Sequence, residues 1–134
     1  MRILSSRQYN DSLKATVQST GKLNFNVETG EVLELTLDKG IKFFMEGNTD
    51  DEQLYMAVMA KPDRDSFQLR KNGAYFYVAA KLLFDDLGVD YKNYTVFYDL
   101  KRCMDFDEAA GGECYKMNFR PIKKNSNDED IDEL

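Results

Sequence analysis

The chain contains no histidine, only two cysteines and no recognised catalytic signature. Without histidine, it lacks the side chain that most often acts as a general base near neutral pH. A closed structural zinc site needs four ligands, mostly cysteine and histidine, so Cys103 and Cys114 cannot complete one. No G-x-S-x-G elbow, phosphate loop or dinucleotide fingerprint occurs. We therefore expect a protein that is not an enzyme and that needs no cofactor and no metal.

Long apolar runs are also missing. No run approaches the roughly 20 residues that a membrane-spanning helix needs, and the first residues, M-R-I-L-S-S-R-Q-Y, lack the apolar core of a secretion signal. These features predict a cytoplasmic protein without a membrane partner. Cys103 and Cys114 could face each other across a hairpin, which leaves a disulfide geometrically feasible, but reduced thiols fit that compartment better.

Acidic residues gather in one loop, Asp105-Phe106-Asp107-Glu108, followed by Glu113. Carboxylates can bind a divalent cation, but this spacing matches no recognised cation loop. Gly111-Gly112 next to it is typical of a hairpin tip. We interpret the segment as a solvated loop.

The formal net charge of −6 is unevenly distributed. Five of the 24 acidic residues lie in the last ten positions, which leaves 19 acids against 18 bases in the rest of the chain. The body is thus close to neutral, and the charge of the whole chain does not exclude a nucleic-acid partner.

A short pattern occurs twice, as Q-S-T-G-K-L-N-F at 18–25 and as R-K-N-G-A-Y-F-Y at 70–77. In each, polar residues lead to one glycine and then to alternating apolar residues, which predicts a hairpin with a glycine turn. An amphipathic helix and two further strands follow each copy. A chance alignment of two β–α–β stretches is the alternative to a true internal repeat.

The sequence therefore predicts an α+β domain, mostly strand, over residues 1–124. It would consist of two tandem ββαββ half-units, at about 14–61 and 66–120, related by a pseudo-twofold axis and followed by a disordered acidic tail at 125–134. Ser6 could cap one or two helical turns in an N-terminal arm. The predicted helices cover 28–35 and 79–88, and the predicted strands cover 15–18, 22–27, 41–45, 53–59, 67–71, 75–77, 94–98 and 114–119.

The repeated pattern resembles the swapped-hairpin DNA-binding unit of the AbrB/SpoVT type. The residues that carry the resemblance are Gly21-Lys22-Leu23-Asn24-Phe25 with Leu35-Thr36-Leu37, and Gly73-Ala74-Tyr75-Phe76-Tyr77 with Leu87-Gly88-Val89. The resemblance implies one interlocked β-rich body that binds duplex DNA, here with both units in one chain. The chain lacks the family's proline after the second strand begins. Near the glycines it has few bases, namely Lys14, Lys22, Arg70 and Lys71.

Strand alternation assigns each aromatic side chain to a face. It predicts that Phe44, Phe76 and Phe97 point outward. The residues predicted to face the core are Leu23, Phe25, Val27, Phe43, Tyr75, Tyr77, Val96 and Tyr98.

Outward aromatic side chains on a sheet can stack the bases of single-stranded nucleic acid, and nearby cations can bind its phosphates. The predicted phosphate-binding residues are Lys22, Lys42, Arg70, Lys71, Lys92, Lys101 and Arg102. The alternative is that helices or a partner subunit bury the second face, so a homo-oligomer stays open.

The end of the chain, D-E-D-I-D-E-L, resembles the acidic tails of bacterial and phage single-stranded-DNA-binding proteins. The resemblance implies that the tail recruits a protein partner and competes with DNA for a basic surface. The residues concerned are Asp128, Glu129, Asp130, Ile131, Asp132, Glu133 and Leu134. A tail that only increases solubility is the alternative.

Three functions follow as hypotheses. The first is a single-stranded-DNA-binding accessory protein with a partner-recruiting tail. The second is a duplex-binding transcription regulator of the swapped-hairpin type, and the third is a protein-interaction module or inhibitor that uses the aromatic face and the acidic tail.

Overall fold

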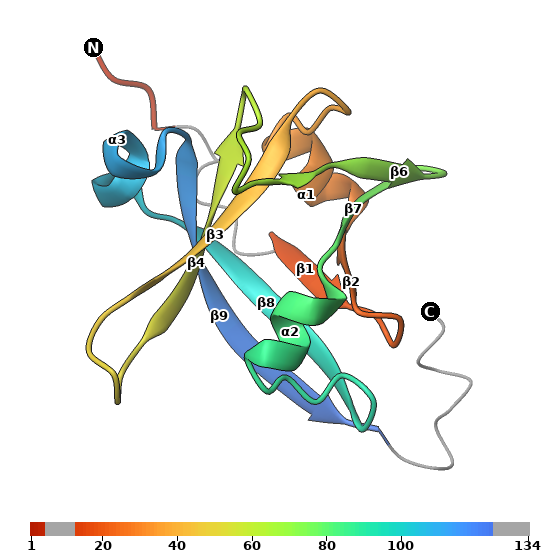
Figure 1. Cartoon of the computed structure of the whole chain (residues 1–134). Helices are drawn as coiled ribbons and strands as arrows, with labels where there is room; N and C mark the ends of the chain where they lie inside the picture. Colours follow the sequence, from red (N-terminus) through yellow and green to blue (C-terminus); the bar gives the residue numbers. More distant parts are fainter. Residues whose placement is uncertain (5–12, 125–134) are drawn as a thin grey trace.

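The computed structural model describes residues 1–4 and 13–124 (Figure 1). The helical turns expected at Ser6 and the acidic tail expected at 125–134 lie outside the described residues.

The described chain is dominated by one antiparallel sheet, as the mostly-β prediction requires. Its strands lie in the order β5-β3-β4-β9-β8-β1-β2-β7-β6. The two end strands, β5 and β6, are separated in sequence only by Leu69, so the sheet curls around until it is nearly closed. The strands are β1 (Lys14–Val17), β2 (Lys22–Phe25), β3 (Gly40–Glu46), β4 (Gln53–Met59), β5 (Phe67–Gln68), β6 (Arg70–Asn72), β7 (Tyr75–Ala79), β8 (Tyr94–Arg102) and β9 (Glu113–Lys123).

The helices are short: α1 (Val27–Val32), α2 (Lys81–Asp86), the 3₁₀ turn η1 (Met104–Phe106) and α3 (Asp107–Ala110). The first two begin and end within three residues of the predicted helices at 28–35 and 79–88. The Asn26 Oδ1 atom accepts a hydrogen bond from the backbone N–H of Thr29 at 2.7 Å, which starts α1 one residue early. Val27 therefore opens the helix and is exposed, contrary to the prediction that it ends a strand on the core face. No helix among the described residues is long and apolar enough to cross a membrane.

Both predicted glycine hairpins form. Strands β1 and β2 pair around Gly21 and strands β6 and β7 pair around Gly73, and both glycines have positive φ, 85° and 63°. Only glycine adopts this backbone conformation without strain.

The two longer helices end in the same way. The backbone N–H of Leu35 donates to the carbonyl of Gly30, and the N–H of Val89 donates to the carbonyl of Phe84, each at 2.9 Å. These bonds satisfy carbonyls that the helix end leaves free. The residue before each donor is left-handed: Glu34 (φ 53°) and Gly88 (φ 73°).

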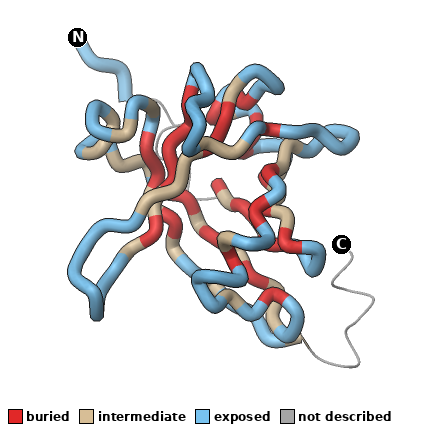
Figure 2. Tube along the Cα trace, in the orientation of Figure 1, coloured by how far each residue is buried: buried red, intermediate tan, exposed pale blue. Residues whose placement is uncertain are grey.

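The core lies inside the curled sheet. Helix α2 inserts Phe84 between Phe43 and Tyr98, with ring centroids 6.2 and 6.0 Å away. Phe84 is fully buried, as are Leu23 and Phe25. Figure 2 shows buried residues along the strands, whereas the hairpin tips and loops are exposed.

The prediction for the faces of β7 is wrong. The pairing of β2 with β7 sets Phe76 opposite Phe25 and Val78 opposite Leu23, so Phe76 packs against the core. Tyr75 is 46% exposed and Tyr77 lies on the outer face. The turns explain the difference, because the first hairpin encloses three residues (19–21) and the second only two (73–74). A shift of one residue moves every side chain of a strand to the other face.

Candidate nucleic-acid interface

Phe97 lies on the outer face of β8, as predicted. Its neighbours Val96 and Tyr98 are buried, while Phe97 is half-buried. The guanidinium carbon of Arg120 on β9 lies 4.6 Å from the centroid of the Phe97 ring. Arg120 also pairs with Asp99, with 2.8 Å between Nε and Oδ2. Phe97 and Arg120 therefore form a cation–π pair that stays accessible from outside the sheet.

The strand register extends this pair into a row across six neighbouring strands. Residues directly opposite each other on antiparallel strands point to the same face. Successive pairs therefore place six side chains on the outer face, each at least partly exposed. This set, called the outer row below, is Arg70 (β6), Tyr77 (β7), Asn24 (β2), Thr16 (β1), Phe97 (β8) and Arg120 (β9).

Tyr77 is the second aromatic residue of the outer row. The Lys22 Nζ atom lies 4.7 Å from the centroid of its ring. Two strands, β2 and β1, separate Tyr77 from Phe97. Three interstrand steps of about 4.8 Å put the two residues roughly 14 Å apart. The outer row thus carries two partly exposed aromatic rings, each with a cation over it.

Phe44 does not belong to this surface. It points away from the core, as predicted, but its ring stacks on Tyr55 at 5.2 Å and meets Phe106 edge-on at 5.6 Å. Phe106 comes from η1, in the segment between β8 and β9. The chain therefore covers Phe44 with its own aromatic residue, and the expectation of an open stacking surface there is wrong.

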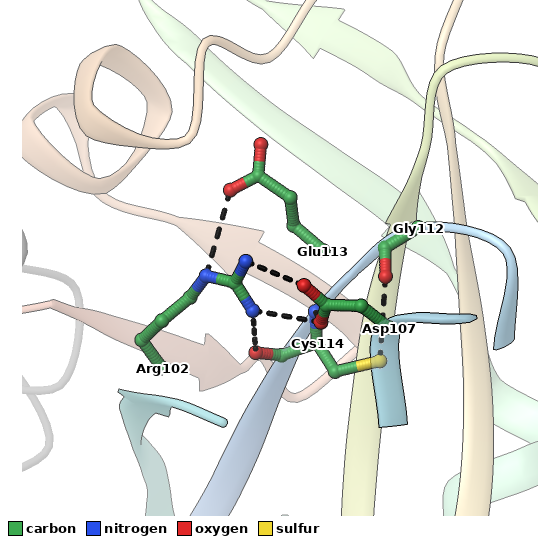
Figure 3. A network of polar contacts seen from close by, with 5 residues as sticks. All are labelled: Arg102, Asp107, Gly112, Glu113 and Cys114. Atoms are coloured by element: carbon green, nitrogen blue, oxygen red, sulfur yellow. Dashed lines mark hydrogen bonds and ion pairs between the residues drawn. The ribbon is translucent and has the colours of Figure 1, made fainter. Parts of the chain in front are cut away.

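A polar network holds that segment in place (Figure 3). The Arg102 guanidinium binds both carboxylate oxygens of Asp107, at 2.8 and 2.6 Å, and Asp107 also accepts the backbone N–H of Cys114 at 2.9 Å. Glu113 lies 3.6 Å from Arg102 Nε. Asp107 is thus part of the fold, contrary to the prediction of a wholly solvated loop, and Arg102 is committed to an ion pair.

The two cysteines are free thiols, as predicted. The backbone N–H of Cys103 donates to the carbonyl of Cys114 at 2.9 Å across the β8–β9 hairpin. Cys114 is fully buried, and burial raises the pKa of its thiol to about 11. A protonated, buried thiol is a poor nucleophile.

The Arg102–Asp107 pair makes stability depend on pH. Hydrogen bonds from Arg102 lower the pKa of Asp107 below its ordinary value, so the pair stabilises the fold above the unfolded-state pKa, about 4, and this contribution is lost as pH falls through the lowered value. We expect Asp107→Asn to cost about 1–2 kcal/mol at pH 7, allowing for partial exposure, and almost nothing near pH 2. Urea unfolding curves at both pH values measure this. An equal loss of unfolding free energy at both pH values would show that the charge of Asp107 does not stabilise the fold through Arg102.

The other predicted phosphate-binding residues are scattered. Lys71 on β6 lies directly opposite Phe76 and therefore points to the inner face, with its Nζ 5.1 Å from the Phe76 ring centroid. Lys42 pairs with Asp63. Lys92 and Lys101 are exposed. Lys92 precedes β8 and Lys101 lies near the end of that strand, so the two residues are about 30 Å apart along an extended chain. Of the predicted cations, only Lys22 and Arg70 lie on the outer face at the row.

Sequence reasoning missed Tyr77, Asn24, Thr16 and Arg120. Tyr77 was assigned to the wrong face. The outward position of Arg120 could have been predicted, because the polar residues Lys116, Asn118 and Arg120 alternate with apolar residues along β9. The other two could be found only from the register between β1, β2 and β8.

Comparison of the chain with protein-family models, with curated proteins and with solved structures finds no match. The resemblance to AbrB/SpoVT-type units therefore stays a prediction from the quoted residues, and a function has to be argued from the geometry.

Proposed function

We propose that this protein binds single-stranded nucleic acid across the outer row. The observation that carries the proposal is the register, which aligns two accessible aromatic residues, Tyr77 and Phe97, between Arg70 and Arg120 at the two ends of the row. Lys22 adds a cation at the Tyr77 ring. Stacking of a base on an aromatic side chain contributes roughly 1–3 kcal/mol and tolerates any base.

The cations at the row suit phosphates of one extended strand. Lys22 and Arg70 form no ion pair with another of the described residues, so their charge is available to a ligand. Arg120 shares its charge with Asp99, which leaves its guanidinium plane beside Phe97 better suited to stacking than to phosphate binding.

We also propose that the domain consists of two ββαββ units related by a pseudo-twofold axis. The strand pairing supports this if β5 and β6 together correspond to β1, β7 to β2, β8 to β3 and β9 to β4. The pairs β1–β2, β3–β4 and β1–β8 then correspond to β6–β7, β8–β9 and β5–β3. The pairs β2–β7 and β4–β9 join the two units to each other. The hydrogen bond from Leu35 to Gly30 also recurs 54 residues later, from Val89 to Phe84.

This symmetry favours a second candidate function, the duplex binding that the AbrB/SpoVT resemblance implies. Lys22, Arg70 and Lys71 lie on the two glycine hairpins and could approach a groove of DNA.

A fluorescence anisotropy titration with a labelled dT oligonucleotide tests the first proposal. With two phosphate contacts, from Lys22 and Arg70, we expect binding to weaken about sevenfold between 50 and 200 mM salt. A chain ending at Lys124, which lacks the five acids of 125–134, should bind more tightly because the acidic segment repels or competes with the strand.

The outcomes separate the candidates. No binding by either chain at low salt would overturn the single-strand proposal. Tighter binding to a duplex of the same length would favour the second candidate. If the shortened chain binds no better than the full chain, residues 125–134 do not act on this site.

A further inference from the structure

The middle of the outer row is polar. Asn24 on β2 lies directly opposite Tyr77 on one side and Thr16 on the other, and Thr16 lies directly opposite Phe97. Both polar side chains are partly exposed, whereas the flanking Leu23 and Phe25 point into the core and are fully buried. A base stacked on Tyr77 would therefore have Asn24 at its edge.

The Asn24 side chain forms no hydrogen bond with any of the described residues, so it does not stabilise the fold in that way. Neighbouring polar residues differ in this respect. Asn26 caps α1, and the buried Thr29 hydroxyl accepts the Lys14 N–H at 2.9 Å and donates to the Lys14 carbonyl at 3.2 Å. An unoccupied carboxamide between two aromatic residues is thus free to bind a ligand.

The chemistry of a carboxamide suits the edge of a base. It offers one acceptor and two donor hydrogens in a plane, and a base edge carries adjacent donors and acceptors in its own plane. An amide that forms two such bonds discriminates between bases, because a wrong base leaves a donor facing a donor.

We infer that Asn24 is a specificity-determining residue that reads the edge of a base stacked on Tyr77. The inference rests on the proposed single-strand binding and adds to it a base preference. Stacking and phosphate contacts supply most of the affinity, and Asn24 supplies the difference between bases.

The test compares wild type with Asn24→Ala in titrations against labelled dA, dC and dT 12-mers. Asn118→Ala is the matched control, because Asn118 is also a partly exposed asparagine, on β9 opposite Asp99 and outside the row. We expect wild type to prefer one homopolymer, and Asn24→Ala to reduce the ratio between the strongest and weakest binding at least about fivefold. Asn118→Ala should keep the wild-type ratio.

Two results would overturn the inference while single-strand binding stands: equal affinity of wild type for all three homopolymers, or an unchanged ratio in Asn24→Ala. If wild type binds none of the three, the proposed function itself fails. Unfolding curves show whether each variant folds. Should alanine destabilise β2, Asn24→Thr replaces it, since threonine suits a strand and lacks the paired amide groups.

Discussion

Replacing both Tyr77 and Phe97 with alanine is expected to weaken binding to a dT oligonucleotide at least about thirtyfold. Each ring offers a stacking surface worth roughly 1–3 kcal/mol, and the lower limits alone add up to that factor. Both rings are partly exposed on the outer face, so their removal should leave the domain folded. Anisotropy titrations at low salt measure the loss, and an unfolding curve for the double variant verifies the fold.

Two variants serve as controls for this result. Tyr77→Phe keeps the ring and should bind like wild type. Phe44→Ala removes an aromatic residue that Tyr55 and Phe106 cover, so it should lower stability and leave the affinity of the folded protein unchanged. If Phe44→Ala abolished binding in a folded protein while the double variant bound normally, the binding surface would lie on β3 and β4 instead.

Gly21→Ala is expected to destabilise the protein by roughly 2–5 kcal/mol. A Cβ atom at Gly21 would lie 2.5 Å from the Cβ and 2.7 Å from the Cα of Lys81, at the start of α2. The backbone of Lys81 cannot move aside without shifting the helix that carries Phe84 into the core. Strain from the positive φ of 85° adds to the overlap. Urea unfolding should show a lower midpoint at an unchanged slope.

Gly73→Ala is the matched control for that experiment. Gly73 holds the corresponding place in the second hairpin with a φ of 63°, but no heavy atom lies within 4 Å of the position its Cβ would take. Its substitution should cost only the conformational strain, about 1–2 kcal/mol. Equal losses at both glycines would mean that contact between the first hairpin and α2 contributes nothing.

The order of elements could be predicted because its signals are local. Gly21 and Gly73 mark turns that need positive φ, and alternation or helical spacing follows each one. These signals act within a few residues, so the hairpins, both longer helices and the later strands lie close to where the sequence places them. The mostly-β fold follows from the same signals.

The candidate site could not be predicted in the same way, because it depends on distant parts of the chain. The outer row joins Thr16 of β1 to Arg120 of β9, and only the strand order brings them into one line. The predicted face of Tyr77 is wrong because the turn of the second hairpin is one residue shorter than the turn of the first. Nothing local in M-D-F-D-E-A-A indicates that Phe106 covers Phe44 on another strand.

The most direct test of the binding surface is a map of backbone amide chemical shifts in the ¹⁵N-labelled protein as a dT oligonucleotide is added. We expect the largest changes on β7, β2, β1 and β8, around Tyr77, Asn24, Thr16 and Phe97, with smaller changes near Arg70 and Arg120. Changes confined to β3, β4 and η1 around Phe44 and Phe106, or no changes in excess oligonucleotide at low salt, would contradict binding across the outer row.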